Sequence, residues 1–142
     1  AGLEAPLSPY AARMLPDWPD GTVAVLSTGG GAPHAIPVST AVRSSPATVH
    51  FALGLRRESL ARLREDPRCA LTVIAAGVAV TAHGTATVVE ENDRVAFVRL
   101  DVEAVQDHDQ PTFEVEEGVR WHWADAGAES GDAEVRAALR AL

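Results

Sequence analysis

Short apolar runs separated by turn-forming residues dominate the first part of the chain. Residues 23–27, 35–42 and 48–53 have the apolar and β-branched composition of strands. Three consecutive glycines at 29–31 separate the first two runs, and a Ser-Ser-Pro segment at 44–46 separates the second from the third. The pattern therefore predicts three strands in succession, joined by short turns.

After these strands, the spacing of apolar residues changes from that of a strand to that of a helix. At 58–65, Leu60 and Leu63 fall on one face of a helix, while arginines occupy the other face. Pro67 limits this helix, because the residue before a proline avoids the helical region of backbone conformation. We therefore expect one compact, arginine-rich helix directly after the third strand.

The strand pattern then returns and continues to about residue 123. Predicted strands are 70–75, 78–90, 98–104, 112–115 and 119–123. The first two of these are expected to pair around Gly77, and the last two to form a hairpin around Glu117 and Gly118.

Both ends of the chain are predicted to carry short helices. Ser8 and Pro9 match the N-cap and first position of a helix over 10–15. At the other end, an amphipathic helix over 135–142 is expected after a loose segment at 126–132. With about seven short antiparallel strands, no repeat and no linker, the fold class is mainly β (α+β), a barrel or sandwich, in a single domain over 1–142.

Composition excludes several classes of protein. A hydrophobic content of 46% against 23% charged residues favours a globular domain over a disordered chain. The net charge of −8 disfavours nucleic-acid partners, because binding to phosphates requires a basic surface. No apolar run is long enough for a membrane span, and the first ten residues lack the features of a signal peptide. Membrane partners are therefore not expected either.

The single cysteine bears on the expected compartment. Cys69 can form no internal disulfide, which is typical of a reducing environment, so we expect a cytoplasmic protein. Because it lies within an apolar run, we interpret Cys69 as a small buried hydrophobic residue and not as a nucleophile.

The stretch from residue 23 to residue 67 also resembles a known family. The residues that carry the likeness, in order, are Leu26, Ser27 and Thr28; Gly31, Pro33 and His34; Pro37 and Val38; and Leu63, Asp66 and Pro67. This order of strand, turn, strand, strand and basic helix resembles the FMN-binding split β-barrel family of pyridoxamine 5′-phosphate oxidase-like proteins. The resemblance implies an antiparallel split β-barrel with short peripheral helices.

The same resemblance implies a homodimer that binds flavin mononucleotide (FMN) at the interface between subunits. It implies that the flavin ring lies against the second strand and the end of the third, with an aromatic segment near the C-terminus closing the site. The cofactor-binding residues expected on this basis are Ile36, Pro37, Val38, Ser39, Thr40, Ala52, Leu53 and Trp121.

The phosphate end of the site departs from the family pattern. The family's Arg-Lys pair falls on Glu58 and Ser59 here, and a common arginine of the second strand falls on Ile36. We expect Arg56 and Arg57 to replace these ligands, aided by the Ser59 hydroxyl and the N–H groups at the helix N-terminus. A solvated arginine face is the alternative, and the sequence leaves both open.

The aromatic and histidine residues leave the chemistry open. Trp121 and Trp123 are expected on one face of a strand, where they cover a ring or form an aromatic core or dimer contact. The histidines lack metal-ligand spacing, so no metal site is expected, although a haem-binding role for His83 or His108 stays open. Catalytic side chains are not identified.

Together these features predict an FMN-dependent oxidoreductase that transfers hydride to or from a small organic substrate. One alternative is a reductase that uses the deazaflavin F420, whose anionic groups lie on a longer tail. A second is a non-catalytic split-barrel protein that carries flavin or binds no cofactor at all.

Overall fold

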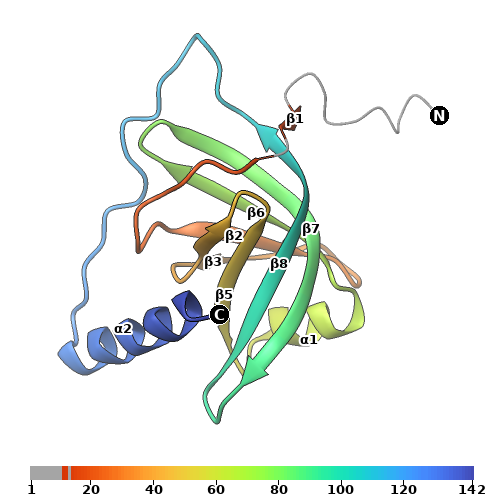
Figure 1. Cartoon of the computed structure of the whole chain (residues 1–142), viewed down its shortest axis with the longest axis vertical. Helices are drawn as coiled ribbons and strands as arrows, with labels where there is room; N and C mark the ends of the chain where they lie inside the picture. Colours follow the sequence, from red (N-terminus) through yellow and green to blue (C-terminus); the bar gives the residue numbers. More distant parts are fainter. Residues whose placement is uncertain (1–10, 13) are drawn as a thin grey trace.

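A computed structural model of the chain describes residues 11, 12 and 14–142, and it is mainly β (Figure 1). The strands are β1 (Ala11–Ala12), β2 (Ala24–Thr28), β3 (His34–Val38), β4 (Val42–Ser45), β5 (Thr48–Gly54), β6 (Arg68–Ala75), β7 (Val78–Glu91) and β8 (Val95–Asp107). The helices are α1 (Glu58–Glu65), after β5, and α2 (Ala126–Arg140), near the C-terminus. Among the described residues, no helix is long and apolar enough to cross a membrane.

The strands form one antiparallel sheet in the order β3-β2-β6-β7-β8-β5-β4, with β1 paired to the end of β8. The two edge strands, β3 and β4, follow each other in the chain and are joined by residues 39–41. The curled sheet is therefore closed at this point by the chain itself and not by a ladder of hydrogen bonds. Away from residues 39–41, β3 and β5 are not paired with each other, so the barrel is split between these two strands.

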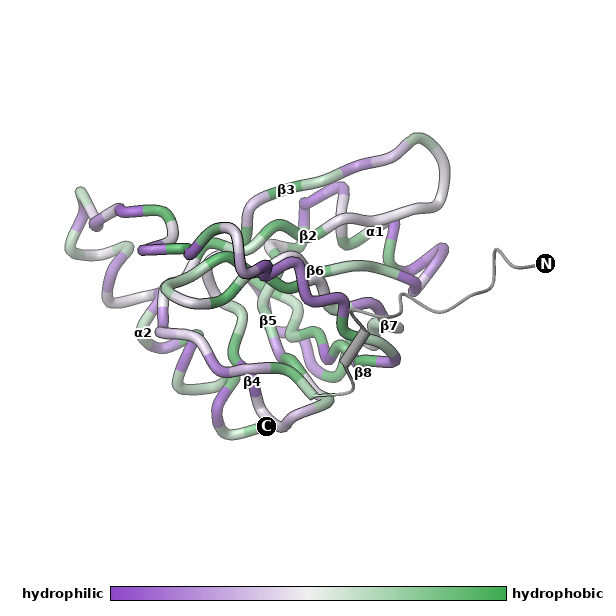
Figure 2. The backbone as a smooth tube through the Cα atoms, turned by 90° about the horizontal axis from the view of Figure 1, so that it is seen from above, coloured by the Kyte–Doolittle hydropathy of each residue, from purple (hydrophilic) through white to green (hydrophobic). Residues whose placement is uncertain are grey.

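Side chains that alternate along the strands point into the barrel and fill its interior. Fully buried core side chains include Leu26, Val49, Phe51, Leu71, Val73, Val98 and Leu100. In Figure 2, hydrophobic stretches run along the strands in the middle of the molecule. Leu60 and Leu63 of α1 cover part of this core, and each such burial contributes roughly 1.5–3 kcal/mol.

Helix α1 has the bounds that the sequence predicts. Its backbone N-cap is Arg57, and it ends at Glu65 because Asp66, the residue before Pro67, is extended. Arg62 fixes the helix to the β2–β3 turn by donating to the carbonyls of Gly29 and Ala32.

One predicted strand is in fact two. The run 35–42 breaks after Val38, and β4 begins only at Val42. At the break the chain passes from one edge of the sheet to the other. Ser39, Thr40 and Ala41 therefore leave the ladder and bond to side chains and to β5 instead. We call residues 39–41 the kink.

The predicted hairpin over 112–115 and 119–123 is wrong. Residues 108–125, which we call the strap, contain no strand and run past the β6–β7 turn. The carbonyl of Val115 accepts a hydrogen bond from the Gly77 N–H (2.9 Å), and a Cβ at Gly118 would lie 2.5 Å from the carbonyl oxygen of Ile74. Contacts with the barrel thus take the place of a ladder within the strap.

Two helix predictions also need correction. Residues 126–132 are not loose but form the first half of α2, because the Asp125 side chain caps the helix by accepting from the Ala128 N–H (2.7 Å). At the other end, Ala11 and Ala12 are not helical and pair as β1 with Val105 and Gln106 of β8. The predicted helix-start residues 8 and 9, with residue 10, lie outside the described residues.

Candidate functional site

The split between β3 and β5 holds a cavity of about 150 Å³, which we call the slot. Its lining residues are Ile36, Pro37, Val38, Ser39, Thr40, Ala52, Leu53, Gly54 and Arg57. The structure thus brings together all the strand residues predicted to contact a ring and Arg57, predicted at the phosphate end, and adds Gly54 to them.

Unequal strand lengths create the slot. Strand β5 pairs with β4 only as far as His50, so its last four residues have an open edge on the side of β3. Ala52 lies on this open edge. Its N–H donates to the Thr40 hydroxyl (3.1 Å), and the hydroxyl donates in turn to the Ala52 carbonyl (3.4 Å). The polar groups at the open strand end are therefore satisfied by the kink.

The N-terminus of α1 lies next to the slot because the connection is a tight turn. The Arg57 N–H donates to the Gly54 carbonyl (3.0 Å), and only three residues separate the end of β5 from the start of α1. No side chain caps this end of the helix. Ser59, in the first turn, is 1% exposed, and its hydroxyl has no hydrogen-bond partner among the described residues. Unsatisfied donors at a helix N-terminus favour an anion.

The charged side chains near the N-terminus of α1 differ in whether they form ion pairs. Arg62 pairs with Glu58 (2.7 Å), and this hydrogen bond, ahead of the charges of Arg62 and His34, lowers the pKa of the Glu58 carboxyl. Among the ion pairs of the described residues, none includes Arg56 or Arg57. Both arginines are exposed, and only Arg57 lines the slot.

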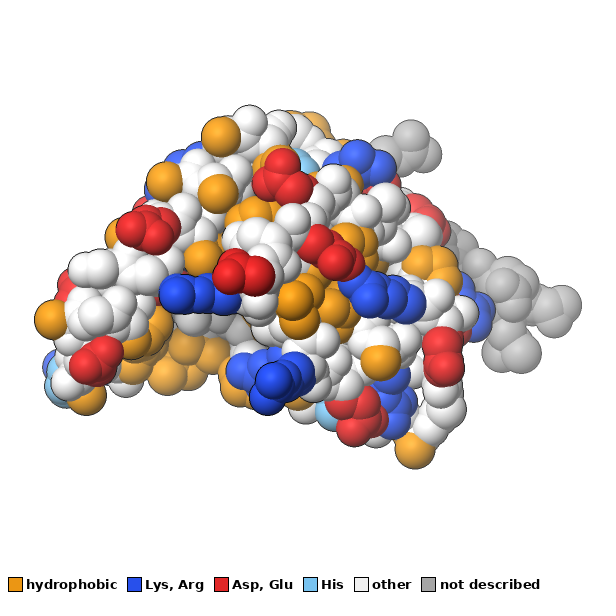
Figure 3. Space-filling view, turned by 90° about the horizontal axis from the view of Figure 1, so that it is seen from below, with side chains coloured by type: hydrophobic (Ala, Val, Ile, Leu, Met, Phe, Trp, Pro, Cys, Tyr) orange, Lys and Arg blue, Asp and Glu red, His pale blue; other side chains and the backbone are white. Residues whose placement is uncertain are grey.

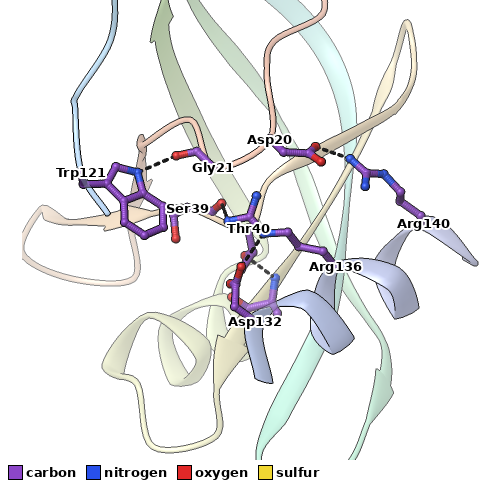
Figure 4. A network of polar contacts seen from close by, with 9 residues as sticks. Asp20, Gly21, Ser39, Thr40, Trp121, Asp132, Arg136 and Arg140 are labelled. Atoms are coloured by element: carbon purple, nitrogen blue, oxygen red, sulfur yellow. Dashed lines mark hydrogen bonds and ion pairs between the residues drawn. The ribbon is translucent and has the colours of Figure 1, made fainter. Parts of the chain in front are cut away.

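Trp121 is not among the residues that line the slot. Its indole N–H donates to the Gly21 carbonyl (2.8 Å), as Figure 4 shows. Its ring packs edge-on against Trp123, with centroids 5.1 Å apart. The two rings contact each other directly, without a strand to align them. Trp121 lines a separate cavity of about 470 Å³ between the strap and residues 19–22.

Arg136 of α2 is a residue that sequence reasoning missed. Its guanidinium donates to the Ser39 carbonyl (3.0 Å) and to the Asp132 carboxylate (2.6 Å), as Figure 4 shows. The spacing of Asp132 and Arg136 is that of a helical ion pair, and it is visible in the sequence once 126–132 is taken as helix.

The remaining candidate groups are engaged elsewhere. No group of three His, Cys, Asp or Glu side chains in the described part of the chain is placed to hold a metal ion. His83 contacts Gln106 (3.4 Å), and His108 contacts the Thr81 hydroxyl (2.7 Å). Burial raises the pKa of the Cys69 thiol to about 12, in agreement with a hydrophobic packing role.

Comparison with known proteins gives one family match. The family model for pyridoxamine 5′-phosphate oxidase matches residues 13–122. No curated protein matches the chain at a significant level.

Several solved structures share the fold. One is a proposed pyridoxamine 5′-phosphate oxidase from Lactobacillus delbrueckii, with 20% identity, a TM-score of 0.53, and coverage of 59% of this chain and 83% of that one. A FAD-binding protein from Mesorhizobium loti has 14% identity and a TM-score of 0.51, covering 62% and 87%. A heme binding protein from Mycobacterium smegmatis has 19% identity and a TM-score of 0.52, covering 61% and 48%. Identities this low show the fold alone.

Proposed function

The chain belongs to the pyridoxamine 5′-phosphate oxidase family, and we propose that it is an FMN-dependent oxidoreductase acting on a small organic substrate at a dimer-interface site. The observation that carries this proposal is the slot. Its walls are an open strand end and a run of small and apolar residues, with one cation, Arg57, at the side where α1 begins. Such a site suits a flat ring that ends in an anionic tail.

The absence of acid–base groups in the slot supports cofactor chemistry over hydrolysis. Arg57 is the one ionisable side chain among the residues that line it. When bound, a flavin supplies hydride transfer through its ring, so the protein has to bind, orient and exclude water. Ile36 and Leu53 provide apolar walls, and the backbone of the kink and of Ala52 provides hydrogen-bonding groups.

The size of the slot supports a homodimer. Cofactor sites usually measure about 300–1,000 Å³, whereas the slot of one chain measures about 150 Å³. A second copy of the chain would supply the missing wall. Large apolar side chains that lie exposed in the single chain include Leu55, Phe113, Val119 and Trp121. Figure 3 shows hydrophobic side chains lying at the surface between charged groups.

At the anionic end, we propose that Arg57 and Arg56 bind the cofactor phosphate together with the first turn of α1. Arginine binds phosphate through two parallel hydrogen bonds, and the unpaired Ser59 hydroxyl lies in the same turn. Glu58 is the unfavourable neighbour, but its charge is offset by Arg62. An F420 tail, which is longer, would use the same cations.

The test is a cofactor titration of the purified protein. Wild-type protein is expected to bind FMN with quenching of flavin fluorescence. Changing Arg56→Ala and Arg57→Ala together is expected to weaken binding by roughly tenfold or more. The matched control, Arg68→Ala with Arg99→Ala, removes the same charge away from the slot and should change affinity less than about threefold. Equal affinities for the two double variants would refute the phosphate assignment.

A non-catalytic role is the alternative, and one observation favours it. Thr40 already occupies the hydrogen-bonding groups of Ala52 that a ring would use. A protein that is colourless as purified and binds neither FMN nor F420 would support this alternative. Binding of FMN and its reduction by a chemical donor, followed by reoxidation with a substrate, would support the oxidoreductase.

A further inference from the structure

Helix α2 lies outside the part of the chain that matches the family, since the match ends at residue 122. It packs on β4 and β5, the strands on one side of the split. Its Leu139 is completely buried, so the helix is anchored on the barrel and does not project from it. What α2 does at the slot therefore lies outside the part of the chain that matches the family.

Arg136 links α2 to the slot. Its side chain is 13% exposed and that of its partner, Asp132, is 12% exposed. The Nε atom donates to Asp132 Oδ2 (2.6 Å), while Nη2 donates to the Ser39 carbonyl oxygen (3.0 Å), 97 residues away in sequence. A largely buried guanidinium with both a carboxylate and a carbonyl acceptor is held in a single geometry.

The segment that Arg136 holds has few backbone partners of its own. Strand β3 ends at Val38 and β4 begins at Val42, so the kink lies outside both ladders. Its carbonyls are held by side chains instead: Arg136 bonds to Ser39, and the Trp18 indole N–H donates to Ala41 (3.0 Å). Removing one of these donors therefore removes one of the few contacts that hold the kink in place.

The kink in turn places the polar group of the slot. Ser39 and Thr40 both line it, and Thr40 bonds to the N–H and carbonyl of Ala52 on the opposite wall. A continuous set of hydrogen bonds therefore runs from Asp132 through Arg136 and the kink to Ala52. A shift at Ser39 changes both the width of the slot and the access to the Ala52 backbone.

We propose that Arg136 is a positioning residue of the slot, which fixes the kink and through it the shape of the flavin site. This inference rests on the proposed function where it concerns flavin affinity. It concerns the structure alone where it says that Arg136 fixes Thr40 against Ala52.

The affinity test compares two substitutions in α2. Arg136→Met keeps much of the side-chain length and removes the donors, whereas Arg140→Gln removes the exposed ion pair that Arg140 makes with Asp20. Arg136→Met is expected to weaken FMN binding by roughly tenfold or more, and Arg140→Gln by less than about twofold. Arg136→Lys, which keeps one charged donor, is expected to recover part of the loss.

A second measurement separates this inference from the proposed function. Hydrogen exchange of the Ala52 amide, followed by NMR without cofactor, should be faster in Arg136→Met than in wild type and unchanged in Arg140→Gln. If wild-type protein binds no flavin, the proposed function fails, and the exchange rates decide whether Arg136 fixes the kink. Unchanged exchange at Ala52 in Arg136→Met would overturn the inference. If wild-type protein binds FMN, an Arg136→Met protein with the same FMN affinity would overturn it as well.

Discussion

Thr40 and Ala52 bond to each other across the split of the barrel, although they belong to different walls of the slot. The Thr40 hydroxyl accepts from the Ala52 N–H at 3.1 Å and donates to the Ala52 carbonyl at 3.4 Å. One side chain thus satisfies both backbone groups that an open strand end would otherwise present. A ligand that uses those groups has to displace Thr40 first.

This relationship makes Thr40 a residue with a measurable structural role. Thr40→Val keeps the shape of the side chain but leaves the Ala52 N–H and carbonyl without a partner. We expect the free energy of unfolding to fall by about 1–2 kcal/mol, measured by urea denaturation. Thr40→Ser retains the hydroxyl and serves as the control, with a smaller loss expected. A Thr40→Val protein as stable as wild type would show that water replaces the hydroxyl without cost.

Gly84 lies where the register between β7 and β8 shifts. A Cβ there would lie 2.0 Å from the carbonyl oxygen of Asp101 and 3.1 Å from Leu100 Cδ1. Gly84→Ala is therefore expected to lower the free energy of unfolding by roughly 1–3 kcal/mol or more. The control is Gly131→Ala in α2, which meets nothing within 4 Å and should raise stability by up to about 1 kcal/mol. Similar stabilities for the two variants would contradict the close approach at Gly84.

His50 should make stability depend on pH. Burial, and next the charge of Arg99, lower the pKa of this imidazole, against an opposing effect of Asp101. The folded protein therefore binds a proton at His50 less readily than the unfolded chain. The contribution of neutral His50 to stability is fully present above pH 6.5, the ordinary pKa of histidine. It is lost as the pH falls from there through the lowered pKa of His50.

The measurement is the melting temperature between about pH 7.5 and 5.5. The fall on acidification is expected to be smaller in His50→Gln than in wild type, whereas the exposed His122→Gln control should keep the wild-type slope. An NMR titration of the His50 ring gives the pKa directly, and a value above 6.5 would contradict the expected direction.

Cys69 should be chemically inert in the folded protein. Its thiol is buried, and burial raises its pKa to about 12, so the reactive thiolate is scarce at neutral pH. We expect labelling by a thiol reagent to be at least about a hundredfold slower in native protein than in urea-unfolded protein. Rapid labelling under native conditions would mean that β6 opens easily or that the thiol is exposed.

Local signals predict the barrel well. Strands β2, β5, β6 and β7 begin and end within two residues of the bounds predicted from composition and turns, and α1 has the predicted bounds. These elements follow from alternation, apolar periodicity and the stop at Pro67, all of which act between near neighbours in sequence.

The strap and α2 were harder to predict, for opposite reasons. The strap has strand-like residues around Glu117 and Gly118, but its backbone partners are on the barrel, at Gly77 and Ile74. Helix α2 contains two glycines, which disfavour a helix, yet the Asp125 cap, the Asp132–Arg136 pair and the burial of Leu139 stabilise it.

The sequence by itself determined most of the barrel strands and the basic helix, because the spacing of apolar residues, the turns and the helix stop depend on residues close together in the chain. Its resemblance to the family implied the split-barrel scaffold and named most of the residues that line the slot. Only the tertiary structure decided that the second strand breaks at Ser39, that Thr40 bonds to Ala52, and that Arg136 reaches the kink. These contacts join residues far apart in sequence, and their geometry exists only once the sheet has curled and α2 has packed on it.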